Sequence, residues 1–209
     1  MKLYLTSNGF EDSAVADYFK NLVLPRQIAD LSFLVISVQD SDSDAVYLQK
    51  TINELKGIGV INIEVFKLRE DKFVSSKEYD VIFVCGGNTF VYLDRIRKTG
   101  LAKFIIDAVK SDRSIYVGVS AGSIVAGPDI AIAGDEDSND IGLADLTGLG
   151  LTNHVIYPHY TEDSREYFDN FQKTSKFPVI EISDIQAVYF NYNDEGILKD
   201  RQIIGQGYA

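Results

Sequence analysis

Short segments that carry hydrophobic residues on both faces are the feature of this chain that most restricts its fold. Five of them, rich in Val, Ile, Phe and Tyr, are predicted to be strands: residues 2–5, 33–38, 61–66, 80–85 and 115–119. A strand that is apolar on both faces belongs in a sheet covered on both sides, as parallel sheets are. Helical patterns separate these segments. The alternation predicts an α/β fold, a three-layer αβα sandwich around a mostly parallel sheet.

The helices are indicated by the spacing of their apolar residues. Ala45, Leu48, Ile52 and Leu55 recur at steps of three and four, and Gly57 is a natural end for that helix. Two further helices are predicted over residues 89–100 and 101–110.

The last third of the chain has a looser pattern. Its acidic segment, residues 134–142, is predicted to be a surface loop. A strand over residues 154–157 precedes a helix, with Asp163 as N-cap and Glu166 at the capping-box spacing. The remaining segments are predicted to be strands that extend the sheet, with an antiparallel hairpin at 193–196: residues 179–182, 186–190, 196–198 and 202–204. No domain boundary is found, so we expect a single domain over residues 1–209.

Composition excludes several classes of protein. Hydrophobic residues make up 45% of the chain, and its single cysteine cannot form an internal disulfide, which fits a reducing compartment. A net charge of -11 repels phosphate backbones, so we expect no nucleic-acid partner. No segment approaches the roughly 18 apolar residues of a membrane helix, and the N-terminus does not resemble a signal peptide. We therefore expect a cytoplasmic protein, with monomer and homodimer both open.

The most informative motif is Gly118-Val119-Ser120-Ala121-Gly122, which directly follows a predicted strand and precedes a helix of small residues. This strand–G-x-S-x-G–helix order is typical of a nucleophile elbow, in which a serine occupies a strained turn at the carboxyl end of a sheet. Short glycine motifs also occur by chance, and a tight turn with an incidental serine is the alternative. Because a strand and a helix flank the motif, Ser120 is predicted to be a nucleophile.

A second glycine motif ends the strand at 80–85 with Gly86 and Gly87. The N–H groups of Gly87 and Ala121 are predicted to form an oxyanion hole, one from each loop. The alternative is a nucleotide-binding turn, but the motif lacks the spacing of G-x-G-x-x-G and of a P-loop. Cys85 is interpreted as a small buried residue rather than a nucleophile.

Only two histidines can serve as a base. His159 follows Pro158 at the end of a predicted strand, where the active sites of open α/β sheets lie. His154 begins that strand, so a structural role is the better interpretation. A base also needs an acid to orient its ring. The residues alone leave that acid open among Asp140, which lies between the serine and the histidine in sequence, and four rivals: Asp129, Asp135, Asp137 and Asp184.

Three segments, taken in this order, resemble the peptidase E and cyanophycinase family of serine peptidases. They are Gly86-Gly87-Asn88-Thr89-Phe90, Gly118-Val119-Ser120-Ala121-Gly122 with Ala126-Gly127-Pro128, and Pro158-His159-Tyr160. The resemblance implies a class I glutamine-amidotransferase-like fold, with Ser120 as nucleophile and His159 as base. It also favours Asp140, within Asn139-Asp140, as the acid, with Asp184 as the alternative.

The same resemblance implies a substrate. Arg165 corresponds to an arginine that receives an aspartyl carboxylate, and Asn88 belongs to the matching glycine segment, so both are expected to bind substrate. A surface arginine paired with Glu162 or Asp169 is the alternative for Arg165. The chain also departs from the family at Ile124, where a polar residue is usual, which puts a strict preference for aspartate in doubt.

These features predict a serine peptidase of the dipeptidase E kind that cleaves short peptides, with an acidic residue in the substrate. It is expected to need no cofactor and no metal. The alternatives are a non-catalytic binding or regulatory domain on the same fold, since a fold does not decide a function, and a flavodoxin-like nucleotide binder.

Overall fold

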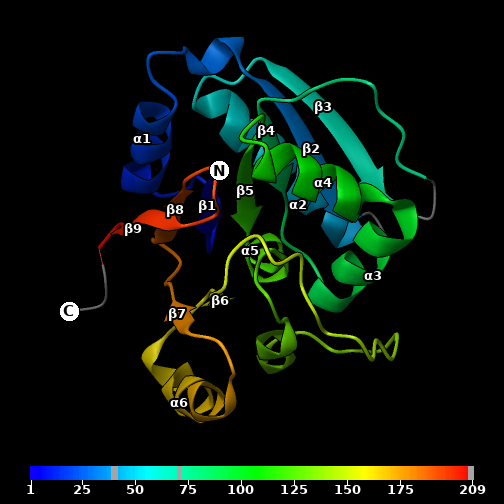
Figure 1. Ribbon diagram of the computed structural model, residues 1–209, viewed down its shortest axis with the longest axis vertical. Helices are drawn as coiled ribbons and strands as arrows, with labels where there is room; N and C mark the ends of the chain where they lie inside the picture. The colour runs from blue at the N-terminus through cyan, green and yellow to red at the C-terminus, as the bar shows by residue number, and fades with distance from the viewer. Residues whose placement is uncertain (39–41, 70–71, 207–209) are drawn as a thin grey trace.

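The computed structural model describes residues 1–38, 42–69 and 72–206, and its central element is a seven-stranded sheet (Figure 1). The strand order is β3-β2-β4-β5-β1-β8-β9. The first five strands are parallel, whereas β8 pairs antiparallel with both β1 and β9. Helices cover both faces. This arrangement confirms the predicted αβα sandwich with a late antiparallel extension.

The strands of this sheet lie close to their predicted positions. They are β1 (Lys2–Thr6), β2 (Ser32–Val38), β3 (Asn62–Leu68), β4 (Val81–Val84), β5 (Ile115–Val119), β8 (Ala187–Tyr192) and β9 (Leu198–Ile204). The central strand β4 is buried along its whole length, as its continuous apolar sequence requires. The hairpin between β8 and β9 turns at Asn193 and Gly196. However, the two segments predicted after this turn form one continuous strand. The middle of edge strand β9 consists of exposed polar residues, so hydrophobicity alone did not indicate a strand there.

Five helices flank the sheet. The right-handed crossovers place α1 (Ser13–Leu22) and α2 (Asp42–Gly57) on one face, and α3 (Thr89–Thr99), α4 (Leu101–Lys110) and α5 (Ala121–Ala126) on the other (Figure 1). The sequence analysis did not identify α1. Asp12 caps its N-terminus by accepting the N–H groups of Ala14 and Val15. Phe19 joins it to the sheet, with its ring centroid 5.6 Å from that of Tyr4.

The strand predicted at residues 179–182 does not extend the main sheet, contrary to the prediction. β6 (Val155–Tyr157) and β7 (Val179–Glu181) form a separate two-stranded parallel sheet, linked through α6 (Arg165–Thr174), and lie beside the main sheet (Figure 1). The physical reason is that β8 already occupies the position next to β1. The helix also begins differently: Ser164 is its N-cap, and Thr161 with Ser164 forms a capping box around a short 3-10 helix, Glu162–Ser164, so Asp163 is not the cap.

The parallel strands direct three loops to one edge of the sheet. β1 ends before Ser7, β4 before the Cys85–Gly87 loop, and β5 before Ser120. Because parallel strands share a direction, these three segments meet at the carboxyl edge. Thr6 pairs with Ala187 across the antiparallel junction, so the loop that precedes β8 lies at this edge too.

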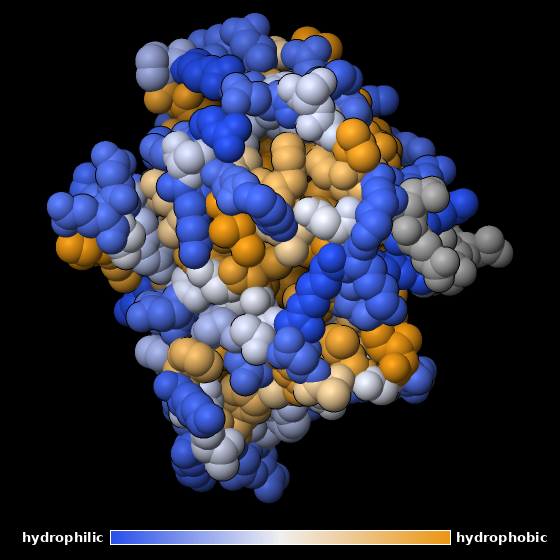
Figure 2. Space-filling view, turned by 45° about the vertical axis from the view of Figure 1, so that its right-hand side comes forward, coloured by the Kyte–Doolittle hydropathy of each residue, from blue (hydrophilic) through white to orange (hydrophobic). Residues whose placement is uncertain are grey.

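The surface drawn in Figure 2 is mostly hydrophilic, and hydrophobic residues appear in the hollows between polar ridges. Within the described ranges, no helix combines the length and the apolar character needed to cross a lipid bilayer.

Candidate active site

Ser120 occupies a sharp turn between β5 and α5. Its backbone has φ 49° and ψ -112°, an uncommon conformation for a residue with a side chain. The flanking glycines permit the turn. A Cβ at Gly118 would lie 2.6 Å from the Gly122 carbonyl, and a Cβ at Gly122 would overlap the Val84 carbonyl. The chain around Ser120 therefore has the geometry of a nucleophile elbow.

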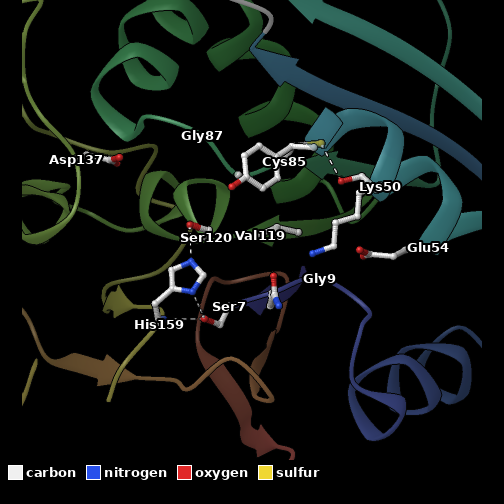
Figure 3. Close-up of a pocket in the computed structure, with 14 residues that line it drawn as sticks. Ser7, Gly9, Lys50, Glu54, Cys85, Gly87, Val119, Ser120, Asp137 and His159 are labelled. Atoms are coloured by element: carbon white, nitrogen blue, oxygen red, sulfur yellow. Dashed lines mark hydrogen bonds between the residues drawn. The ribbon is translucent and has the colours of Figure 1, made fainter. Parts of the chain in front are cut away.

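His159 faces this serine. Its Nε2 lies 2.9 Å from Ser120 Oγ. Figure 3 marks this hydrogen bond with a dashed line. The histidine follows Pro158 at the carboxyl end of β6 and has a left-handed backbone, with φ 57°. The backbone N–H of His159 donates to Ser7 Oγ at 2.7 Å, and this hydrogen bond helps to hold the left-handed conformation. The two residues named from the sequence as nucleophile and base are thus within proton-transfer distance.

Asp184 is the carboxylate next to the imidazole. Its Oδ1 lies 2.6 Å from His159 Nδ1. The small sheet explains the contact: Tyr157 pairs with Glu181, so the segments that leave β6 and β7 run side by side, and the Tyr160 N–H donates to the Ile182 carbonyl. An Nδ1–H that donates to Asp184 leaves Nε2 free to accept the Ser120 hydroxyl proton.

Asp140, the acid favoured by the resemblance, is not placed at the imidazole. Its Oδ2 accepts the hydroxyl of Ser138 in the exposed acidic loop. The rival aspartates have other partners: Asp129 accepts the Ala131 N–H, Asp135 the Tyr157 hydroxyl and Asp137 the Thr89 N–H. Asp184, the alternative acid, lies next to the imidazole because it follows β7, which pairs with the strand before His159. Asp140 follows the elbow helix instead.

Ser7 is a site residue that the sequence analysis missed. Its side chain is fully buried. Its Oγ accepts the backbone N–H of His159 and donates to Asp184 Oδ1 at 3.1 Å. The same Oγ lies 3.3 Å from the ring Nδ1 of His159. It therefore contacts both members of the His–Asp pair. The available signal was its position immediately after a buried parallel strand, at the edge that also carries Ser120.

The glycine loop after β4 passes close to the nucleophile. A Cβ at Gly86 would lie 3.9 Å from Ser120 Oγ, and Gly87 has φ 145°, which favours glycine. The N–H groups of Gly87 and Ala121 have no hydrogen-bond partner in the part of the chain that the structure describes. They are therefore free to serve a ligand oxygen. Cys85 is buried, and burial raises the pKa of its thiol to about 12, so it is a poor nucleophile at neutral pH.

Arg165 and Asn88 are engaged elsewhere. Arg165 makes two hydrogen bonds of 2.7 Å to the Glu162 carboxylate, which is the surface pairing considered from the sequence. Asn88 is the N-cap of α3 and accepts the Val91 N–H, while its Nδ2 donates to the Ser138 carbonyl at 2.8 Å. Neither side chain lines the cavity beside Ser120.

His154 lies away from this site. Its side chain is buried, its Nδ1 lies 3.3 Å from Thr152 Oγ1, and its ring packs on Phe190 with centroids 5.2 Å apart. Burial, with a smaller contribution from Arg201, lowers the pKa of His154. These contacts agree with a structural role.

A cavity of about 410 Å³ opens beside Ser120 and His159 (Figure 3). This volume is typical of small-ligand sites. Its far wall is a face of α2 that carries Tyr47, Lys50, Thr51 and Glu54. These residues follow the i, i+3, i+4, i+7 spacing of one helix face. The sequence analysis used only the apolar stripe of this helix and missed the polar one.

The site contains the groups that acyl transfer uses. It combines a hydroxyl, a base within 2.9 Å, an orienting carboxylate and two free N–H groups. Across the described ranges, no three His, Cys, Asp or Glu side chains converge as a metal ion would require.

The nucleophile elbow at the carboxyl edge of this αβα sheet agrees with the predicted class I glutamine-amidotransferase-like fold. The model of peptidase family S51 matches residues 3–197, and the chain belongs to this family. The chain is 32% identical over 127 residues to an uncharacterized peptidase of Pasteurella multocida, covering 57% of this chain and 59% of that protein. It is 36% identical over 117 residues to peptidase E of Shewanella amazonensis, covering 56% of this chain and 48% of that protein.

The chain therefore spans about half the length of the curated relatives it matches. The fold is shared more completely by a crystal structure of a protein from Listeria monocytogenes EGD-e, provisionally named peptidase E. That structure matches with a TM-score of 0.75 and 21% sequence identity, over 99% of this chain and 98% of the other. At this identity the likeness concerns the fold alone.

Proposed function

We propose that this chain is a serine peptidase that hydrolyses short peptides through an acyl-enzyme on Ser120. The observation that carries the proposal is the continuous relay from Ser120 Oγ to His159 Nε2, at 2.9 Å, and from His159 Nδ1 to Asp184 Oδ1, at 2.6 Å. The names of the relatives support peptidase activity. The sequence analysis expected the same nucleophile and base.

The reaction has two halves. Ser120 Oγ attacks the peptide carbonyl carbon while His159 Nε2 takes the hydroxyl proton. His159 then gives this proton to the leaving amine, and the C–N bond breaks to leave an ester on Ser120. Water attacks that ester with His159 again as base, which releases the acid and restores the hydroxyl. Asp184 stabilises the imidazolium that forms in each half.

The carbonyl oxygen becomes negatively charged in both tetrahedral intermediates. The N–H groups of Gly87 and Ala121 flank the nucleophile and are unpaired among the described residues, so we assign them to this oxyanion. Donors that are already in place need no reorganisation when the charge develops.

The acidic-substrate preference implied by the resemblance depended on Arg165. Because Arg165 pairs with Glu162 and does not line the cavity, we do not carry the aspartyl preference into the proposal. The class of substrate that remains is a short peptide, small enough for a cavity of about 410 Å³.

A fluorophosphonate probe tests the proposal directly, because it reacts with an activated serine hydroxyl. We expect stoichiometric labelling of the wild-type chain, located to Ser120 by peptide mass spectrometry, and loss of hydrolysis of a dipeptide panel in the labelled protein. Absence of labelling together with absence of hydrolysis would favour the alternative, a non-catalytic domain on this fold.

Replacing Ser7 with alanine tests the support of the relay. Ser7→Ala removes the acceptor of the His159 N–H and a donor to Asp184, so we expect labelling to slow by about 10- to 100-fold. Ser114→Ala is a matched control, since it also removes a buried hydroxyl, one that donates to the Tyr79 carbonyl at 2.6 Å. Both variants should lose thermal stability, but only Ser7→Ala should label slowly. Equal labelling rates would show that Ser7 is merely structural.

A further inference from the structure

The cavity beside Ser120 carries an unpaired carboxylate at its far end. Glu54, on α2, is half-buried, and Figure 3 shows its carboxylate and the Lys50 ammonium directed toward the same part of the cavity, across from Ser120 and His159. Its Oε2 accepts only the Phe10 N–H, at 3.4 Å. Its Oε1 has no hydrogen-bond partner in residues 1–38, 42–69 and 72–206. Burial, with a smaller contribution from Glu11, raises the pKa of this carboxyl, although the Phe10 N–H and the Lys50 charge oppose the rise.

The backbone opposite Glu54 allows this approach. Gly9 has φ 68°, and a Cβ at this position would lie 2.8 Å from Glu54 Oε2. The glycine therefore lets the carboxylate reach the end of β1 and point into the cavity.

Lys50 lies near enough to oppose the rise in the Glu54 pKa, but its ion pair is with another carboxylate. Its ammonium forms an ion pair with Glu11, and no cation lies within ion-pair distance of Glu54 in the described part of the chain. Lys50 and Glu11 cancel each other, so Glu54 contributes a net negative charge to this end of the cavity.

The other side of the nucleophile is also acidic. Asp137 lines the same cavity, and an adjoining space of about 30 Å³ is lined by Asp135 and Glu136 as well as by Ser120. Burial, with the neighbouring aspartates, raises the pKa of Glu136. Among the described residues that line the two spaces, Lys50 is the one lysine or arginine.

We propose that Glu54 anchors a positively charged group of the substrate, so that the site selects cationic short peptides rather than acidic ones. The inference rests on the proposed function for the reaction, but the binding it describes needs no catalysis. An ammonium or guanidinium at Glu54 would supply the missing partner of a half-buried carboxylate, and charge-assisted hydrogen bonds of this kind are among the strongest available. The cation can come from the amino terminus of a peptide or from a basic side chain.

Calorimetric titration of the Ser120→Ala variant separates binding from hydrolysis. Four ligands distinguish the sources of charge: Lys-Ala, norleucyl-Ala, N-acetyl-Lys-Ala and N-acetyl-norleucyl-Ala. Relative to N-acetyl-norleucyl-Ala, which has neither an ammonium at its amino terminus nor a basic side chain, we expect Lys-Ala to bind about 10- to 100-fold more tightly. Norleucyl-Ala keeps only the terminal ammonium and N-acetyl-Lys-Ala only the side-chain ammonium, so the one that keeps this advantage identifies the group that Glu54 holds.

The advantage should disappear in Ser120→Ala/Glu54→Gln. It should persist in Ser120→Ala/Glu195→Gln, which removes the same charge from the exposed β8–β9 turn. Equal affinity for all four ligands, no measurable binding of any, tighter binding of Asp-Ala than of Lys-Ala, or an advantage that survives Glu54→Gln would each overturn the inference. A wild-type chain that fails to hydrolyse peptides while showing this binding pattern would overturn the proposed reaction alone.

Discussion

Ser120→Ala is expected to lower kcat for peptide hydrolysis by about 10⁴- to 10⁶-fold, the loss seen when a serine hydrolase is deprived of its nucleophile. The alanine removes the atom that forms the ester. The Ser7 hydroxyl donates to Asp184 and lies next to His159 Nδ1, not next to the Nε2 that serves as base. Ser123, one turn further along α5, is buried and donates to the Thr6 carbonyl at 2.7 Å. The measurement is the initial rate on the best dipeptide of a panel, with circular dichroism to confirm that the fold is kept.

Ser123→Ala is the matched control for this variant, because it removes a buried hydroxyl from the same short helix. We expect it to retain most of its activity while losing some stability. A Ser120→Ala enzyme with an undiminished rate would show that hydrolysis proceeds elsewhere, and the acyl-enzyme mechanism would have to be abandoned.

Asp184→Asn is expected to lower kcat by roughly 10³-fold with little change in KM. The asparagine keeps the size of the side chain but cannot stabilise the imidazolium, and its amide can favour the wrong tautomer of His159. We place the loss below the largest known for such residues because the Asp184 side chain is 57% exposed, and water can partly replace the carboxylate.

Asp140→Asn provides the direct comparison. Because its carboxylate accepts the Ser138 hydroxyl in an exposed loop, we expect less than about a twofold change in kcat. Steady-state rates of the two variants, measured side by side, decide between the two acids. A large loss in Asp140→Asn with none in Asp184→Asn would mean that the acidic loop moves onto His159 during the reaction.

The elbow and the glycine loop were predictable because each depends on local sequence. A buried strand, a glycine where chains touch, and a helix immediately after it occupy consecutive positions, as at Gly118 and Gly122. His159 was predictable for a simpler reason: the chain has only two histidines, and one follows a strand. Parallel strands share one carboxyl edge, so segments far apart in sequence could be expected to meet there.

The acid and the far wall of the cavity depended on contacts between distant segments. Asp184 reaches His159 because β6 pairs with β7 outside the main sheet, and no local pattern distinguishes this pairing from an extension of that sheet. Glu54 lines the same cavity as Ser120 because α2, which packs against β2, brings it next to Gly9 in the segment that follows β1. The sequence indicated where Glu54 lies on its helix, but it did not indicate that Ser120 lies across the cavity from it.

The sequence by itself therefore determined the αβα architecture, the strained serine and the histidine, because hydrophobic periodicity and glycine spacing act over a few residues. Only the tertiary structure decided that Asp184 lies next to the imidazole, that Ser7 contacts both His159 and Asp184, and that Arg165 does not line the cavity. Those outcomes depend on which strands pair and which side chains find closer partners, and such competition is settled only when the whole chain is packed.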